Sequence, residues 1–176
     1  MRNRRLLVIP VFLLVVGLVC SGASFGIGKG DKAPDFQVKT LDGKDLSLRK
    51  LLAPGVDRKK AVILSFWATW CPPCRQEAPH LNKLYNKYKD KSVAVVAISI
   101  DQEGAKAVRP LVDKMGLKYT IGLDPEGKAA EKYGVQYIPL VFVIDSRGVI
   151  RLMRQGYSAD TEKSLEAAVK AALDTK

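Results

Sequence analysis

The 176-residue sequence has few of the residues that build metal centres and disulfide frameworks. It contains three cysteines, Cys20, Cys71 and Cys74, and a single histidine, His80. Three cysteines are too few for a disulfide-stabilised scaffold, and a structural zinc ion needs four ligands. No internal repeat is visible, and the composition excludes collagen-like, low-complexity and wholly disordered proteins. With 47% apolar residues, the chain can instead build one domain around a hydrophobic core.

Acidic residues are scarce relative to basic ones: 18 against 29, which gives a formal net charge of +11. Such an excess raises the question of nucleic-acid binding. The lysines, however, are spread along the chain, and the densest group lies on a predicted helix and its exit, at Lys83, Lys87, Lys89 and Lys91. That arrangement is typical of a solvated helix face. We therefore expect no nucleic-acid partner.

The start of the sequence predicts export from the cytoplasm. Met1–Arg5 carries three arginines and no acid, and Leu6–Val19 follows without a charged residue. This apolar run is too short for a membrane-crossing helix of about 20 residues, but it fits a signal peptide. We expect a signal peptide over residues 1–23, with an uncleaved membrane anchor as the alternative. Cys20 resembles a lipid-modified cysteine poorly, because a bulky valine precedes it.

Residues 24–32 are rich in Gly and Lys and predict a linker, and residues 33–176 predict a single domain. Alternating residues around the Asp42-Gly43 turn predict a leading β-hairpin over 36–40 and 45–48. After a short helix or loop, the predicted strands cover 61–67, 93–100, 119–123, 140–144 and 149–155, and the predicted helices cover 72–89, 103–115, 127–133 and 161–173. This alternation implies a parallel core sheet covered on both faces, with an antiparallel pair at its end.

Two cysteines lie between a predicted buried strand and a predicted helix, in the sequence Trp70-Cys71-Pro72-Pro73-Cys74. Cysteines at positions i and i+3 across a helix start can approach closely enough for a disulfide. The ring closed by that bond is small, so the bond constrains the unfolded chain little. The position therefore favours redox chemistry, with an inert structural disulfide or a zinc site as the alternatives.

The helix start also predicts different roles for the two cysteines. Free N–H groups and the helix dipole favour an anion there, which stabilises the thiolate of Cys71. We expect Cys71 to be the nucleophile and Cys74, one turn further and more buried, to be the resolving cysteine. Because Pro72 and Pro73 have no N–H group, we expect only a moderate lowering of the Cys71 pKa.

The stretch Phe66–Pro79 (FWATWCPPCRQEAP) resembles the thioredoxin superfamily, and more narrowly the exported thiol–disulfide oxidoreductases of the TlpA/ResA type. Further parts of the family's pattern match Gly30–Phe36, Gly134–Pro139, Asp145–Gly148 and Gly156. The resemblance covers about Gly30–Leu173. It implies an α/β thioredoxin fold, in which a central mixed sheet has helices on both faces, an N-terminal β-hairpin and an inserted helix–strand unit at Asp101–Lys118.

The resemblance also implies roles for single residues. Pro139 would follow a cis peptide bond and face Cys71, which leaves the backbone of Ile138 free to pair with a substrate strand. From the residues alone, Pro139 could equally be a trans proline that opens a strand. Glu77 would be an acidic residue that influences thiol protonation, and its alternative is an exposed glutamate stabilised by the helix dipole. Three neighbours would support the cysteines: Trp70, Pro72 and Pro73.

The sequence thus predicts an extracytoplasmic enzyme that exchanges its Cys71–Cys74 disulfide with protein thiols and needs no cofactor. By resemblance it is a reductant, for example in cytochrome c maturation, and a membrane redox donor would reduce it again. We expect it in the periplasm or at the outer face of the cytoplasmic membrane. It would contact a membrane only through a retained N-terminus.

Two other functions stay open. A copper-delivery protein would use both thiolates as soft ligands and would need a third, for which His80, Met115 and Met153 have no motif around them. A thiol peroxidase shares the segment Ala33-Pro34-Asp35-Phe36. Peroxiredoxins, however, place their reactive cysteine in a Pro-x-x-x-Thr-x-x-Cys pattern. Here Thr69 precedes Cys71 by two residues, and the proline is missing.

Overall fold

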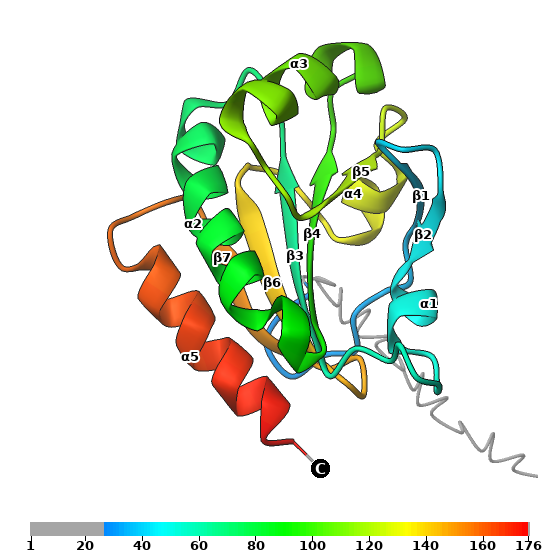
Figure 1. Cartoon of the computed structure of the whole chain (residues 1–176), viewed down its shortest axis with the longest axis vertical. Helices are drawn as coiled ribbons and strands as arrows, with labels where there is room; N and C mark the ends of the chain where they lie inside the picture. The colour runs from blue at the N-terminus through cyan, green and yellow to red at the C-terminus, as the bar shows by residue number, and fades with distance from the viewer. Residues whose placement is uncertain (1–26, 176) are drawn as a thin grey trace, which may run out of the picture.

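The computed structural model describes residues 27–175, which form a seven-stranded mixed sheet with helices on both faces (Figure 1). The strands are β1 (Gln37–Thr40), β2 (Asp45–Ser47), β3 (Ala61–Trp67), β4 (Val93–Ser99), β5 (Thr120–Leu123), β6 (Leu140–Asp145) and β7 (Ile150–Gln155). The helices are α1 (Leu48–Leu52), α2 (Pro72–Tyr88), α3 (Ala105–Met115), α4 (Lys128–Lys132) and α5 (Thr161–Leu173), with a 3₁₀ turn at Lys89–Lys91. The strand order across the sheet is β2-β1-β5-β4-β3-β6-β7.

The predicted signal peptide, residues 1–23 with Cys20, lies outside the described residues. In the part of the chain that the structure describes, no helix is long and apolar enough to cross a membrane.

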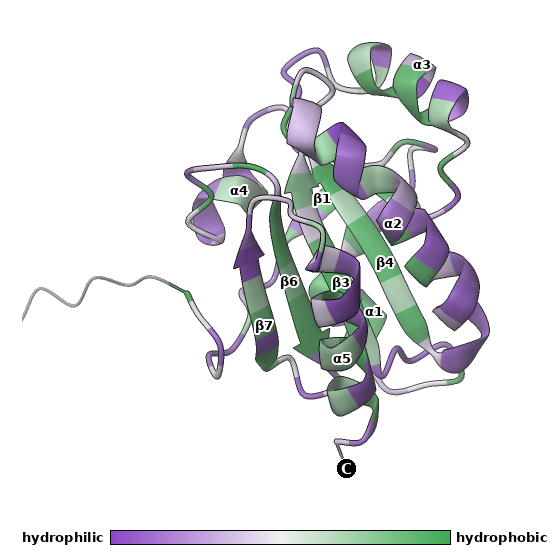
Figure 2. Cartoon of the chain, turned by 90° about the vertical axis from the view of Figure 1, so that its left-hand side faces the viewer, coloured by the Kyte–Doolittle hydropathy of each residue, from purple (hydrophilic) through white to green (hydrophobic). Residues whose placement is uncertain are grey.

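Strand β3 forms the centre of the fold, because all seven of its residues are buried. It pairs in parallel with β4 and antiparallel with β6, so both of its edges are covered. Helices α2 and α5 cover one face of the sheet and bury Leu84 and Leu165 there. The other face buries Phe36 and Tyr133, the latter next to α4. Figure 2 shows that the central strands β3, β4 and β6 are mostly hydrophobic, whereas β7 and helix α2 carry hydrophilic stretches.

Strand β6 departs from the parallel core that the alternation of strands and helices predicted. Strands β3, β4 and β5 are parallel, but β6 runs antiparallel to β3. Helix α4 has five residues and rises only about 7 Å, whereas the six residues of β6 span about 20 Å. The chain therefore stays at the end of the sheet where β5 stops, and β6 starts there. The predicted antiparallel pair at the end of the sheet is confirmed as β6 and β7.

The N-terminal segments add to both edges of the sheet. The predicted hairpin is confirmed, because β1 pairs antiparallel with β2 and also with β5. The predicted linker covers residues 24–32, and the part of it that the structure describes is hydrogen-bonded to β7. The Gly30 N–H donates to the Ile150 carbonyl at 2.8 Å, and the Ile150 N–H donates to the Asp31 carbonyl at 2.9 Å. Gly30 and Asp31 therefore belong to the folded unit.

Candidate active site

The two cysteines lie at the start of α2, in the turn that follows β3. Cys71 is the N-cap residue, and Pro72 and Pro73 are the first two residues of the helix. Cys71 and Cys74 form a disulfide with Cα atoms 5.3 Å apart, and the two residues are 4% and 2% exposed, so the expected difference in burial is small. The Cys74 N–H donates to Cys71 Sγ at 3.3 Å. Since the prolines have no N–H, this is the first helical donor that can stabilise a Cys71 thiolate.

A loop from far along the chain meets the disulfide. The Ile138–Pro139 peptide bond is cis, the isomer that the resemblance implied. The carbonyl oxygen of Ile138 lies 3.8 Å from Cys71 Sγ. The loop leads into β6, and the pairing of Leu140 with Phe66 of β3 brings it to the start of α2. The sheet register thus joins segments that are 67 positions apart in the sequence.

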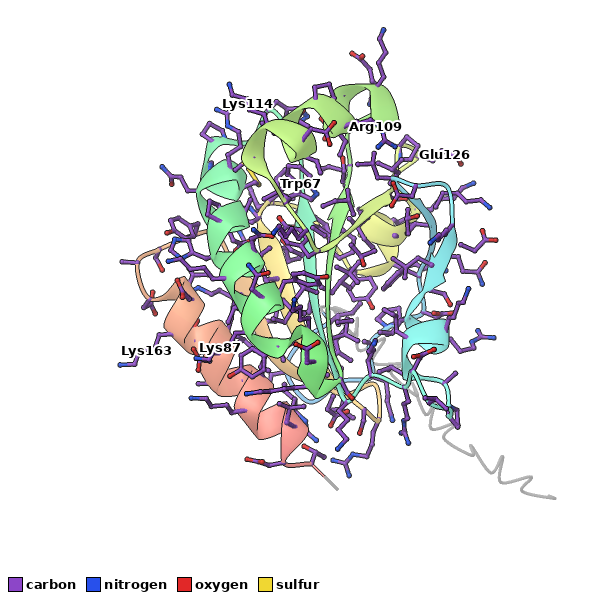
Figure 3. The ribbon with its side chains drawn as sticks, viewed as in Figure 1. Trp67, Lys87, Arg109, Lys114, Glu126 and Lys163 are labelled. Carbon is purple, nitrogen blue, oxygen red and sulfur yellow. A yellow bond between two sulfur atoms is a disulfide. The ribbon has the colours of Figure 1, made fainter. Side chains whose placement is uncertain are left out.

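Two exposed aromatic side chains stand beside the cysteine loop and the cis-proline loop. Trp70 has 64% of its surface exposed, and Tyr137 has 66%. By contrast, Trp67 is buried, and Figure 3 shows it among the strands and helices. Exposed apolar surface next to a reactive site is suited to contact with another molecule. Sequence reasoning found Trp70 but missed Tyr137, whose position two residues before the cis proline was the available signal.

Asp101 fixes the loop that carries Trp70 and Cys71. It follows β4 and is 4% exposed. Its carboxylate accepts hydrogen bonds from the Thr69 hydroxyl at 2.6 Å, the Thr69 N–H at 3.0 Å and the Ser99 hydroxyl at 2.7 Å. A hollow of about 460 Å³ lies next to this network. Sequence reasoning missed Asp101, because only the pairing of β3 with β4 brings it to Thr69.

Glu77 lies on α2, three residues after Cys74, and has only 1% of its surface exposed. The Ser65 hydroxyl donates to Glu77 Oε2 at 3.0 Å. Burial raises the pKa of Glu77 to about 7, and this effect outweighs the lowering by Ser65 and by the positive charge of Arg154. The alternative of an exposed glutamate is therefore wrong. A carboxyl group that titrates near neutral pH, one turn from a disulfide, can accept or release a proton there.

The single histidine does not join the cysteines. His80 Nδ1 contacts the Glu162 carboxylate, and its Nε2 lies 2.7 Å from the Tyr157 hydroxyl. Both partners belong to α5 and the loop before it, so His80 is engaged there and not as a third ligand beside the cysteines. Across residues 27–175, no group of three or more His, Cys, Asp or Glu side chains is arranged to hold a metal ion.

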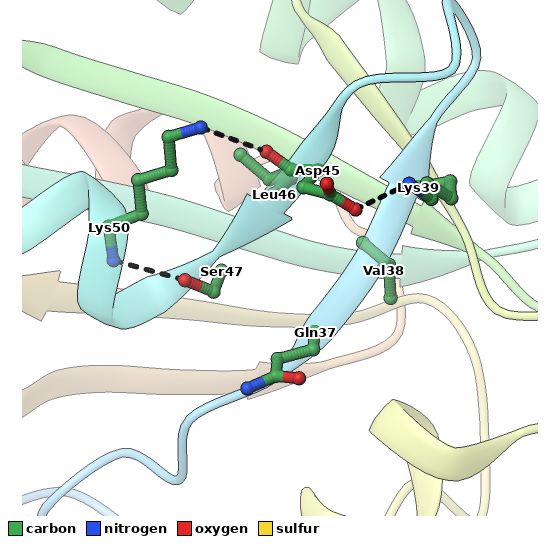
Figure 4. Close-up of a pocket in the computed structure, with 7 residues that line it drawn as sticks. All are labelled: Gln37, Val38, Lys39, Asp45, Leu46, Ser47 and Lys50. Carbon is green, nitrogen blue, oxygen red and sulfur yellow. Dashed lines mark hydrogen bonds and ion pairs between the residues drawn. The ribbon is translucent and has the colours of Figure 1, made fainter.

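A separate hollow of about 300 Å³ lies at the N-terminal hairpin (Figure 4). It is lined by β1, β2 and α1, where Lys39 and Asp45 form an exposed ion pair at 2.6 Å. Strand β2 is four positions from β3 in the sheet, which corresponds to about 19 Å. None of the predicted site residues lines this hollow, so we do not include it in the site.

Comparison with known proteins supports the redox interpretation. The model of the AhpC/TSA family matches residues 29–153. Thiol-disulfide oxidoreductase ResA of Bacillus thuringiensis (strain Al Hakam) is 36% identical over 159 residues, which cover 90% of this chain and 86% of that protein. Thioredoxin-like protein YneN of Bacillus subtilis (strain 168) is 40% identical over 143 residues, which cover 80% of this chain and 78% of YneN.

Solved structures agree with these relatives. A candidate thiol:disulfide interchange protein DsbE from Chlorobium tepidum superposes with a TM-score of 0.74 at 34% identity, covering 84% of this chain and 99% of that one. StoA from Bacillus subtilis superposes with a TM-score of 0.63 at 27% identity, covering 78% and 97%. The predicted thioredoxin fold is thereby confirmed. The chain belongs to the AhpC/TSA family and is a thioredoxin-like thiol–disulfide oxidoreductase.

Proposed function

We propose that the protein reduces disulfides of other proteins outside the cytoplasm, with Cys71 as nucleophile and Cys74 as resolving cysteine. The observation that carries this proposal is the position of Cys71 Sγ, between the first free N–H of α2 and the Ile138 carbonyl beside the cis proline. The helix start favours a thiolate there, and an extended substrate segment can lie along the backbone of Ile138. The exposed Trp70 and Tyr137 would contact that segment.

The reaction needs no cofactor, because the two cysteines carry both electrons. The Cys71 thiolate attacks one sulfur of a substrate disulfide, so that a Cys71–substrate bond forms and the substrate S–S bond breaks. The Cys74 thiolate then attacks Cys71 Sγ, releases the second substrate thiolate and leaves the Cys71–Cys74 disulfide. The substrate has gained two electrons, and its two thiolates take up protons from solvent.

Glu77 serves the second step in this proposal. Cys74 is buried and must lose its proton before it attacks, because the thiolate is the nucleophile. The Glu77 carboxylate, one turn further along α2, accepts that proton. Its pKa of about 7 leaves it partly ionised at neutral pH, so it can accept the proton and later release it.

The proposed direction of electron flow rests on the small number of helix donors available to a Cys71 thiolate. A strongly stabilised thiolate makes the reduced form stable and the protein an oxidant. Here Pro72 and Pro73 remove two helix donors, and the Glu77 carboxylate lies further along the helix. We therefore infer a reductant, which a membrane redox donor would reduce again. The haem-binding cysteines of apocytochrome c, during cytochrome c maturation, are one example of a substrate.

The extracytoplasmic location rests on the sequence. The basic start and the apolar run support a signal peptide or anchor over residues 1–23, ahead of a single domain over 33–176. The curated relatives are named thiol-disulfide oxidoreductases, which supports the exchange reaction and leaves its substrate open.

A cysteine trap tests the exchange with proteins. The Cys74→Ser variant retains the nucleophile but cannot resolve, so we expect a stable mixed disulfide between Cys71 and its partner, visible on a non-reducing gel. The matched control is Cys71→Ser, which retains only the resolving cysteine and should accumulate no adduct. A reactive Cys71 that forms no mixed disulfide with any protein disulfide offered to it would contradict the proposal.

The reduction potential tests the direction separately. We expect a value near that of thioredoxin, about −270 mV, after equilibration with glutathione or dithiothreitol buffers. A value near about −120 mV, typical of a strong oxidant, would overturn the reducing role and leave the exchange reaction intact.

The AhpC/TSA match makes a thiol peroxidase the second candidate. In that reaction the Cys71 thiolate would attack a peroxide oxygen and become a sulfenic acid with release of water or an alcohol, and Cys74 would close the disulfide with release of water. We expect peroxide to oxidise the reduced protein far more slowly than a protein disulfide does, in a stopped-flow comparison of tryptophan fluorescence.

A further inference from the structure

Arg154 on β7 lies in the same row of the sheet as Ser65, the hydrogen-bond partner of Glu77. Ser65 of β3 pairs with Val141 of β6, and Val141 pairs with Arg154 of β7. Directly paired residues project their side chains from the same face of a sheet. Val141 is buried in the same core cluster as Cys74 of α2. Arg154 therefore projects onto the face that α2 covers, two strands and about 10 Å from Ser65.

The buried polar atoms without a hydrogen-bond partner gather on this face. Among the described residues, 27–175, they are Glu77 Oε1, Arg154 Nε and Trp67 Nε1. Trp67 follows Ser65 by two positions on β3 and so projects from the same face. Unpaired buried polar groups are unfavourable, and in native proteins they call for a functional explanation. A carboxylate and a guanidinium of opposite charge thus share one buried surface next to the disulfide.

The outer end of Arg154 is fixed by the loop between β7 and α5. Its Nη2 donates to Asp160 Oδ1 at 2.7 Å and to the Ser158 hydroxyl, and its Nη1 donates to the Ser164 hydroxyl at 3.4 Å. Only 23% of the Arg154 side chain is exposed. These hydrogen bonds hold the guanidinium group in one position, with its Nε buried.

We propose that Arg154 is a positioning residue for thiol–disulfide exchange: its anchored guanidinium supplies the positive charge that favours the ionised form of Glu77. The inference rests on the proposed function, in which Glu77 is the base that serves Cys74. Arg154 acts through Glu77, because it sets the fraction of Glu77 that is ionised at neutral pH.

The other groups around Glu77 do not supply that charge. Ser65 on β3 is a neutral donor, and Cys74 precedes Glu77 by one turn on α2. Tyr119, ahead of β5, is neutral because burial and the charge of Glu77 both raise its pKa. Toward α5, Asp160 pairs with Arg154 and reduces its field, while Glu162 is paired with His80 and Lys83. Coulombic attraction to Arg154 accordingly lowers the pKa of Glu77 against the effect of burial.

The test is a pH titration of Glu77 in the oxidised, full-length protein. The ¹³C NMR signal of its carboxyl carbon monitors the titration, and the Glu77→Gln variant identifies that signal. Arg154→Met should raise the midpoint above about 7, by roughly half a pH unit, because loss of an opposite charge disfavours the ionised carboxyl group, and this charge lowers the pKa of Glu77 less than the Ser65 hydrogen bond does. Arg154→Lys, which keeps the charge, should shift it by less than half as much.

The matched control is Lys163→Met, which removes one positive charge from the exposed face of α5 and should leave the midpoint unchanged (Figure 3). Should Arg154→Met fail to fold, Arg154→Gln removes the charge and keeps hydrogen-bonding capacity toward Asp160 and Ser158. An unchanged Glu77 midpoint in a folded variant without the Arg154 charge would overturn the inference.

Kinetics separate this inference from the proposed function. The pH profile of mixed-disulfide resolution should move with the Glu77 midpoint in Arg154→Met, whereas a purely structural role would lower the rate at every pH. If Glu77→Gln leaves the profile of the exchange unchanged, the role of Glu77 as base fails. The NMR titration would still test, independently of the kinetics, whether Arg154 affects the pKa of Glu77.

Discussion

Two regions of the molecule shield a carboxylate from solvent, but they differ in depth and in the partners that they provide. Asp145, at the end of β6, is 0% exposed, and Glu77, on α2, is 1% exposed. Burial alone raises the pKa of a carboxyl group, because it disfavours the charged form. The two groups nevertheless shift in opposite directions, because Glu77 lies deeper in the protein and has fewer hydrogen-bond partners than Asp145.

Asp145 is fully paired. It accepts hydrogen bonds from the N–H groups of Arg147 at 2.8 Å and Val149 at 2.9 Å, and from Arg151 Nε at 2.8 Å. Burial would raise the pKa of Asp145, but the hydrogen bonds from Val149, Arg151 and Arg147 outweigh it and hold the pKa below its usual value. This carboxylate stays charged and fixes the turn between β6 and β7.

Glu77 is under-paired by comparison. The Ser65 hydroxyl donates to Oε2, and the charge of Arg154, which lies two strands from Ser65, also lowers the pKa of Glu77. Burial therefore prevails, and the pKa rises to about 7. The difference teaches that the same fold holds one carboxylate fully paired at a turn and leaves another poorly paired near its disulfide, which is the environment that the proposed proton transfer by Glu77 requires.

Removal of the fully paired carboxylate should have the largest effect on stability. Asp145→Ala leaves Arg151 and two backbone N–H groups without their acceptor, so we expect a loss of about 3 kcal/mol in the free energy of unfolding. Urea denaturation measures the loss, with the exposed Asp57→Ala as the control. A loss below about 1 kcal/mol would mean that Asp145 does not fix the turn.

Neutralisation of the under-paired carboxylate should instead stabilise the protein at high pH. The folded-state pKa of Glu77 lies above its ordinary value of 4.5, so its contribution to stability is complete below pH 4.5 and is lost as the pH rises through 7. Glu77→Gln should therefore be more stable than the wild type at pH 8, by about 3 kcal/mol, since one pKa unit corresponds to about 1.4 kcal/mol. A stability difference that does not change between pH 4 and pH 8 would contradict this sign.

Removal of the Ser65 hydroxyl, which donates to Glu77, should have a smaller effect than either carboxylate substitution. It sharpens the contrast between the fully paired Asp145 and the poorly paired Glu77. The Ser65 hydrogen bond lowers the pKa of Glu77, so Ser65→Ala should raise the midpoint further, by about half a pH unit to one. The titration of the Glu77 carboxyl carbon measures this shift. A midpoint that falls in Ser65→Ala would show that the hydroxyl stabilises the neutral acid instead.

Much of the fold was predictable, because its signals are local. The buried strand at 61–67, the Asp42-Gly43 hairpin and the prolines at the start of α2 each determine their own segment. The direction of β6 was not predictable from the alternation of elements, because it depends on how short α4 is.

The features of the site likewise divide into those with a local signal in the sequence and those that depend on the sheet register. The spacing of Cys71 and Cys74 is local, and the sequence predicts both the pair and its place at a helix start. The burial of Glu77 and its link to Arg154 depend on the register of β3, β6 and β7, which no local pattern contains. The same holds for the bonds of Asp101 to Thr69.

The rate at which Cys74 resolves a mixed disulfide, measured against pH, tests the proposed chemistry most directly. In the wild-type protein the rate should rise through a midpoint near pH 7, as the Glu77 carboxyl group ionises. Glu77→Gln should remove that midpoint and slow the step about a hundredfold at neutral pH, the typical contribution of a general base. The same pH profile in both proteins would contradict the assignment of Glu77 as the base for Cys74.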